Sequence, residues 1–197
     1  MDEQEEITQH YLAASTVVDY RHPQVWQQAQ ALAQGAPDTL QVARRCFEFV
    51  RDEIAHSFDI DSGPVSCSAS EVLRQGHGIC YAQSHLLAAL FRANGIPAGF
   101  CYQRLDDEQG GFCLHGFNSV YLPEYGWYRI DARGNTGDID AQFSPPHERL
   151  AFTTQGRGEI DYGLNLVEPL PCVIRALQGA PSIEALRNAL PASIRMG

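Results

Sequence analysis

The first half of the chain has the hydrophobic pattern of helices. Apolar residues recur every three or four positions, which collects them on one face of a helix. Three ranges show this spacing: 23–33, about 38–55 and 80–94. The first stripe consists of Val25, Trp26, Ala29 and Leu32. The third range is expected to be a buried central helix ending at Asn94 and Gly95, because glycine readily adopts the left-handed conformation of a helix C-terminus.

Polar residues mark where helices begin. Asp38 stands at the start of the second helix, where its carboxylate can accept a hydrogen bond from the first turn. Ser70 is interpreted in the same way as the cap of a short helix over residues 70–75. A further short helix is expected near residues 182–190.

The periodicity changes after Gly95 from a helical to a strand-like one. Three runs have this character: 96–105, 116–122 and 127–132. Turn residues separate them at 106–111 and at the Pro-Glu-Tyr-Gly sequence of 123–126. This order predicts an antiparallel meander packed on the earlier helices, which is an α+β protein.

Nothing in the pattern divides the chain. No repeat or flexible linker interrupts the 197 residues, so a single domain covering 1–197 is expected. Within it we distinguish an N-terminal helical part of about 1–56, a core of about 57–135 and a C-terminal extension of about 136–197.

Composition narrows the classes of partner and compartment. The formal charge of −10 argues against nucleic acid and anionic membrane surfaces as partners. The first residues are acidic and are followed by no apolar run, so a cytoplasmic protein is expected. The six cysteines are interpreted as reduced thiols, since a chain of this size forms its own core without disulfides.

Cys80 is the candidate nucleophile. It stands at the start of the third long helix, where free N–H groups and the positive end of the helix dipole favour a thiolate. Gly78 would let a substrate approach the backbone, and the N–H of Cys80 could donate to an oxyanion. The alternative is a small buried thiol without chemistry.

His115 and Asp131 are the candidate base and its carboxylate. They flank the 123–126 turn on two strands expected to be neighbours, and a contact between them needs a register slip of about three residues. Taken singly, His115 could be an ordinary core or surface histidine and Asp131 a turn carboxylate. Together with Cys80 they follow the order thiol, imidazole, carboxylate that a cysteine nucleophile requires.

Metal chemistry is not indicated. His77 precedes Cys80 by three residues and Cys113 precedes His115 by two, but four ligands at zinc-finger spacing are absent from the sequence. His77 is interpreted as a solvent-exposed loop residue. No metal and no cofactor is expected.

Four segments resemble the transglutaminase-like superfamily. The resemblance is carried by Phe-Val-Arg-Asp-Glu-Ile at 49–54, Ser-Ala-Ser-Glu-Val-Leu at 68–73, Gly-His-Gly-Ile-Cys-Tyr through Gly-Ile-Pro at 76–97, and the span 115–131. It covers about residues 40–135. It implies a papain-like fold in which Cys80 is the nucleophile, His115 the general base and acid, and Asp131 the residue that orients the imidazole.

The sequence also departs from the family pattern. Phe117 stands where the family usually has an aromatic residue that is often Trp, and Ser119 stands where it usually has Glu. Residues 132–135 lack the Pro-Thr pair that is common after the aspartate. His56 stands where an aromatic residue is common, and it could donate a hydrogen bond to the oxyanion. A half-exposed histidine at a helix end is the alternative for His56.

Three functions are compatible with these residues. The first is a cysteine-dependent enzyme that hydrolyses a peptide or isopeptide-type amide through a thioester, with a peptide or small amide as substrate and cross-linking of proteins less favoured. The second is an arylamine-type N-acetyltransferase, which has a similar order of residues but would need an acyl-CoA site. The third is a non-catalytic binding module on the same scaffold.

Overall fold

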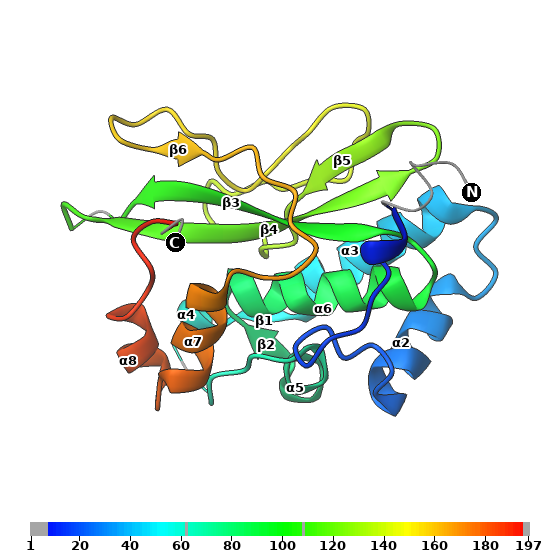
Figure 1. Cartoon of the computed structure of the whole chain (residues 1–197), viewed down its shortest axis with the longest axis horizontal. Coiled ribbons are helices and arrows are strands. Elements are labelled where there is room, and N and C mark those ends of the chain that lie inside the picture. The colour runs from blue at the N-terminus through cyan, green and yellow to red at the C-terminus, as the bar shows by residue number, and fades with distance from the viewer. Residues whose placement is uncertain (1–7, 62, 108, 195–197) are drawn as a thin grey trace.

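The computed structural model places its helices against one face of an antiparallel sheet (Figure 1), which confirms the α+β class. It describes residues 8–61, 63–107 and 109–194. The helices are α2 (Pro23–Ala33), α3 (Thr39–Glu53), α4 (Ser57–Ile60), α5 (Ala69–Gln75), α6 (Cys80–Ala93), α7 (Pro171–Gly179) and α8 (Ile183–Arg187). None of the helices in these ranges is long and apolar enough to cross a membrane.

The sheet has the strand order β5-β4-β3-β6, and all its pairs are antiparallel. Its strands are β3 (Ala98–Asp106), β4 (Phe112–Leu122), β5 (Gly126–Ile130) and β6 (Ile160–Asp161). The first three form the expected meander. A separate parallel pair of strands, β1 (Ala55–His56) and β2 (His77–Gly78), was not predicted. β2 directly precedes α6 in the chain.

Helix α6 is the centre of the molecule. Figure 1 shows it directly beneath β4, and every residue from Tyr81 to Ala93 is buried. Gly95 has φ 70°, and the N–H of Ile96 bonds to the carbonyl of Phe91 at 3.0 Å, so the expected glycine-dependent end is present. The prediction of a buried central helix is confirmed.

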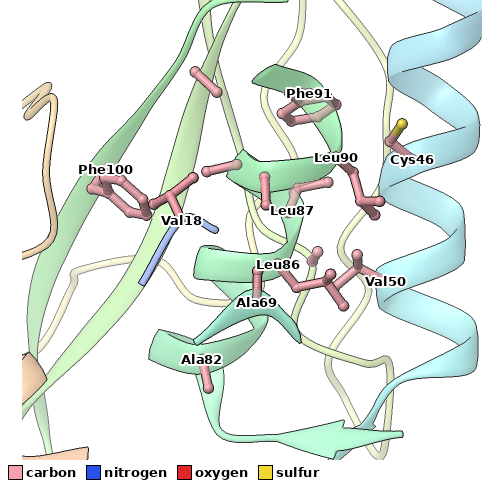
Figure 2. Close-up of a cluster of buried hydrophobic side chains, with 14 of the residues drawn as sticks. Val18, Cys46, Val50, Ala69, Ala82, Leu86, Leu87, Leu90, Phe91 and Phe100 are labelled. Atoms are coloured by element: carbon pink, nitrogen blue, oxygen red, sulfur yellow. The ribbon is translucent and has the colours of Figure 1, made fainter. Parts of the chain in front are cut away.

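The core fills the space between α3, α6 and the sheet. Figure 2 shows Leu86 and Leu90 of α6 facing Cys46 and Val50 of α3, while Phe100 of β3 closes the other side. The stripe over 23–33 correctly predicts α2, but Trp26 of that stripe is 47% exposed and does not join the core.

The helix caps agree with the sequence in one case and differ in another. Asp38 accepts a hydrogen bond from the N–H of Gln41 at 2.8 Å, as expected. Helix α5 is capped by Ser68 rather than Ser70: the Ser68 side chain accepts from the N–H of Glu71, and the Glu71 side chain accepts from the N–H of Ser68. This reciprocal capping box satisfies two donors, which a single serine at position 70 would not do.

Candidate active site

Cys80 lines the cleft in which the candidate site residues meet. It is the first residue of α6 and is half-buried, and the cleft has a volume of about 600 Å³. His56 and His115 line the same cleft. Apolar side chains form much of its remaining wall: Phe58, Leu105, Leu114, Phe152 and Leu190.

His115 and Asp131 meet across two strands. The imidazole Nε2 and the carboxylate Oδ2 are 2.7 Å apart. Asn118 pairs with Ile130 in the β4–β5 register, so Asp131 falls opposite Phe117 and lies diagonally from His115 on the same face of the sheet. Because β4 begins at Phe112 rather than at residue 116, His115 lies inside the strand and not at its beginning. The predicted slip of about three residues is therefore a diagonal offset of two.

The Asp131 carboxylate is buried but fully engaged. Besides His115, it accepts the N–H of Arg133 and the N–H of Ala151, each at 3.1 Å. Burial raises the pKa of Asp131, but the charge and hydrogen bond of His115 and these two backbone donors outweigh burial and lower the pKa. The carboxylate is thus held ionised, as a group that orients an imidazolium must be.

The thiol and the imidazole shift each other's protonation. Burial raises the pKa of Cys80, but the charge of His115, its hydrogen bond to the thiol and the nearby His56 lower the pKa from 9.0 to about 6. Burial lowers the pKa of His115, yet Asp131 and Cys80 raise the pKa from 6.5 to about 10. At neutral pH the pair is a thiolate beside an imidazolium, which is the reactive form of a cysteine nucleophile.

Two aromatic rings fix the plane of the His115 imidazole. Phe117, two residues further along β4, stacks with it at a centroid distance of 5.8 Å and an angle of 15°. Phe152 meets it edge-on at 4.9 Å and 82°. The ring therefore has little freedom to turn away from Asp131.

His56 lies beside the start of the nucleophile helix. It is 7% exposed, so the half-exposed alternative is wrong, because β1 carries the side chain into the cleft wall. Its Nε2 accepts the N–H of Cys80 at 3.1 Å. A ring that accepts at Nε2 carries its proton on Nδ1 when neutral. In this arrangement His56 is an acceptor and occupies the Cys80 N–H that was expected to face an oxyanion.

A charged pair joins the two sides of the site. Arg133 donates two hydrogen bonds to Asp59, at 2.8 and 2.9 Å, and Asp59 Oδ1 lies 3.9 Å from Nδ1 of His56. The Nδ1 atom is buried and has no hydrogen-bond partner among the described residues. Since the N–H of Arg133 also binds Asp131, this arginine connects the surroundings of His56 with those of His115.

His77 is buried rather than exposed, which corrects the sequence interpretation. It is 9% exposed, and its Nδ1 lies 3.0 Å from the hydroxyl of Ser57. The pairing of β2 with β1 draws it inward, and Gly63 packs so closely that a Cβ there would meet the ring at 2.2 Å. In the part of the chain that the structure describes, no cluster of three or more His, Cys, Asp or Glu side chains could hold a metal.

The sequence interpretation missed Ala151 and Phe152, which the C-terminal extension brings to the site. Ala151 contributes only a backbone N–H, which leaves no signal in a residue pattern. Phe152 is a single apolar residue in a segment without regular structure.

Comparisons with known proteins identify the family of this chain. The model of the transglutaminase-like superfamily matches residues 27–132, more than half of the chain. The chain belongs to the transglutaminase-like superfamily. This family match ends one residue after Asp131, so the 133–194 segment that completes the cleft lies outside it.

Two solved structures illustrate how this member of the transglutaminase-like superfamily compares with others. A "putative cysteine protease" from Cytophaga hutchinsonii has a TM-score of 0.53 and 18% identity, over 67% of this chain and 43% of that chain. The periplasmic domain of TgpA from Pseudomonas aeruginosa has a TM-score of 0.49 and 19% identity, over 67% of this chain and 48% of that one. The chain thus spans less than half the length of either structure, and at these identities the likeness concerns the fold. No curated protein matches the chain.

Proposed function

We propose that this chain is a cysteine-dependent enzyme that cleaves a peptide or isopeptide-type amide through a thioester. Cys80 is the nucleophile, His115 the general base and acid, and Asp131 the orienting carboxylate. The observation that carries the proposal is the 2.7 Å bond between His115 and Asp131 beside a thiol of lowered pKa in one cleft. The alternative of a non-catalytic binding module would be favoured if His115 and Asp131 were too far apart to bond.

The reaction has two halves. The Cys80 thiolate attacks the amide carbonyl, and a proton from His115 goes to the leaving nitrogen, so that an amine departs and a thioester remains. Because Asp131 holds Nε2, the proton is transferred at Nδ1. His115, now neutral, takes a proton from water, the hydroxide attacks the thioester, and the acid and the Cys80 thiolate are regenerated.

The oxyanion forms beside the N–H of Cys80. In our proposal the substrate oxygen takes the place of His56 Nε2 as the acceptor of that N–H. The displaced His56, protonated on Nδ1, can then turn to donate the second hydrogen bond to the oxyanion. This reconciles the expected donor role of His56 with its acceptor role in the substrate-free arrangement.

Hydrolysis is proposed in preference to cross-linking of two proteins, with a peptide or small amide as substrate. The cleft of about 600 Å³ has the size typical of sites for small ligands or short peptide segments. A charge of −10 disfavours nucleic acid and anionic membranes as partners. A cytoplasmic location is part of this proposal, since reduced thiols suit that compartment.

Selective alkylation tests the nucleophile. At about pH 7, iodoacetamide should modify Cys80 first, because burial raises the pKa of Cys46, Cys67 and Cys101 to about 12 and that of Cys113 to about 11. Peptide mapping by mass spectrometry identifies the modified thiol. Cys80→Ala should remove the fast reaction and leave the circular dichroism spectrum unchanged. Faster modification of another thiol in the folded protein would overturn the proposal.

Capture of Cys80 by an aldehyde tests the chemistry. A set of short peptide aldehydes with free N-termini should inhibit the alkylation of Cys80. An aldehyde and a thiolate form a hemithioacetal, which resembles the tetrahedral intermediate. Acetyl-CoA should leave the mass of the protein unchanged. Stoichiometric acetylation of Cys80 would instead support the N-acetyltransferase alternative.

A further inference from the structure

Tyr81 connects the helix of the nucleophile to the strand of the base. It follows Cys80 in the first turn of α6 and is 1% exposed. Its hydroxyl donates to the carbonyl of Leu114 at 2.6 Å. Leu114 directly precedes His115 in β4, so this hydrogen bond ties the residue after the thiol to the residue before the imidazole.

The ring of Tyr81 also touches the residue after His115. A Cβ built on Gly116 would lie 2.8 Å from Cδ1 of Tyr81, closer than real Cβ contacts. Glycine at this position therefore lets the ring pack closely against the backbone of β4. With its hydroxyl on Leu114 and its ring on Gly116, Tyr81 holds the strand on both sides of His115.

This part of β4 lacks a strand on one edge. The pairing with β5 ends where Asn118 meets Ile130, whereas the pairing with β3 continues to Phe112. Beyond the end of β5, the N–H of Leu114 donates to the carbonyl of Pro191 at 2.7 Å. The carbonyl of Leu114 accepts a hydrogen bond from the Tyr81 hydroxyl. Buried backbone groups require partners, so Tyr81 supplies one that the sheet does not.

The Tyr81 phenol keeps its proton, and so remains a hydrogen-bond donor, over the pH range in which the site works. Burial, followed by the charges of Cys80 and Cys113, raises the pKa of Tyr81 well above 10.0. The hydrogen bond to the Leu114 carbonyl therefore does not titrate together with the thiol and the imidazole.

We propose that Tyr81 is a positioning residue that sets the separation between the Cys80 thiol and the His115 imidazole. The inference rests on the proposed function in that it takes these two groups as the reacting pair. A hydrogen bond and a charge attraction both weaken as the two groups separate. A displacement of β4 against α6 at Leu114 and Gly116 moves His115 directly, since it lies between them.

The test is the pH dependence of Cys80 alkylation by iodoacetamide, which requires no known substrate. Tyr81→Phe keeps the ring and removes only the hydroxyl. We expect the Cys80 pKa to rise by about one unit, so that alkylation near pH 6 slows several-fold. With a cleaved substrate in hand, kcat should fall while KM changes little.

Tyr102→Phe is the matched control. Tyr102 is equally buried, and its hydroxyl accepts the N–H of Leu170, a residue outside β4, at 3.1 Å. This variant loses the same atom from the same kind of environment. Its Cys80 pKa should equal that of the wild type, even if both variants lose similar thermal stability.

A second variant keeps the test decisive if Tyr81→Phe does not fold. Gly116→Ala retains the hydroxyl, but its Cβ would lie 2.8 Å from Cδ1 of Tyr81 and 3.2 Å from Cε1 of Tyr102, so it should displace β4 from the Tyr81 ring and also raise the Cys80 pKa. A folded Tyr81→Phe or Gly116→Ala protein with the wild-type Cys80 pKa would overturn the positioning role alone. An ordinary thiol pKa in the wild type would overturn the proposed function and this inference with it.

Discussion

At the scale of single residues, the site depends on two groups whose pKa values move in opposite directions. Asp131 is one of the main causes, because its buried carboxylate raises the pKa of His115, and the resulting imidazolium lowers the pKa of Cys80. The three groups therefore titrate as a unit, and the limbs of a pH profile belong to the pair of thiol and imidazole.

Asp131→Asn should narrow the active pH range from both sides. In the wild type, activity should rise as Cys80 ionises near pH 6 and fall as His115 loses its proton near pH 10. Without the carboxylate charge, the pKa of His115 falls and that of Cys80 rises. We expect kcat to drop by roughly 100-fold or more, measured as a pH–rate profile.

Asp140→Asn is the control for this profile. Asp140 is an exposed carboxylate paired with Arg149, away from the cleft lining. The Asp140→Asn substitution should leave the pH values of both limbs of the pH–rate profile unchanged. An Asp131→Asn profile that kept the wild-type limbs would show that the carboxylate does not control the imidazole.

At the scale of elements, caps and strand ends place the reacting groups. The capping box of α5 fixes the segment that leads into β2 and then into α6. It therefore helps to position the start of α6, where Cys80 lies. The strand ends matter as much: β5 stops at Ile130, which leaves Asp131 free to turn towards His115.

Ser68→Ala should lower the free energy of unfolding by about 1 kcal/mol, the usual cost of losing an N-cap side chain. The matched control is Ser70→Ala: the Ser70 hydroxyl lies 3.2 Å from that of Ser68 and, among the described residues, accepts no backbone N–H of the helix. The control should cost clearly less. Urea unfolding followed by circular dichroism measures both, and equal losses would contradict the assignment of Ser68 as the cap.

At the scale of the molecule, segments outside the family match complete the structure. The N–H of Ala151 and the ring of Phe152 reach the site from beyond residue 132. Arg92, at the far end of α6, is 3% exposed and donates to the carbonyls of Ala13, Ala98 and Val167. It thereby joins the N-terminal segment, the sheet and the C-terminal extension.

Arg92→Met should lower the free energy of unfolding by on the order of 3 kcal/mol, because buried carbonyls in three segments lose their donor. Chemical denaturation measures the loss. Arg45→Met is the control: Arg45 also donates to two carbonyls, those of Leu32 and Gln34, but in a more exposed setting. It should cost less than about 1 kcal/mol, and a similar cost for both would show that Arg92 does not join the segments.

Helices, strands and caps could be predicted from the sequence, but contacts between residues far apart in the chain could not. The stripes of α3 and α6, the cap at Asp38 and the end at Gly95 were predictable because each depends on residues within a few positions. α4, α7 and the short strands were missed, since two to nine residues carry too little periodicity. The burial of His77 was missed because it depends on the pairing of β2 with β1, which lie far apart in sequence.

The sequence by itself determined the fold class, the nucleophile candidate at a helix start and the order of thiol, imidazole and carboxylate. These follow from local periodicity and from residue types. Only the tertiary structure decided that His115 and Asp131 are diagonal neighbours, that His56 accepts the Cys80 N–H, and that the Ala151 N–H and the Tyr81 hydroxyl donate to Asp131 and to the Leu114 carbonyl. Such contacts depend on strand register and on backbone groups, and neither leaves a mark on the identity of a single residue.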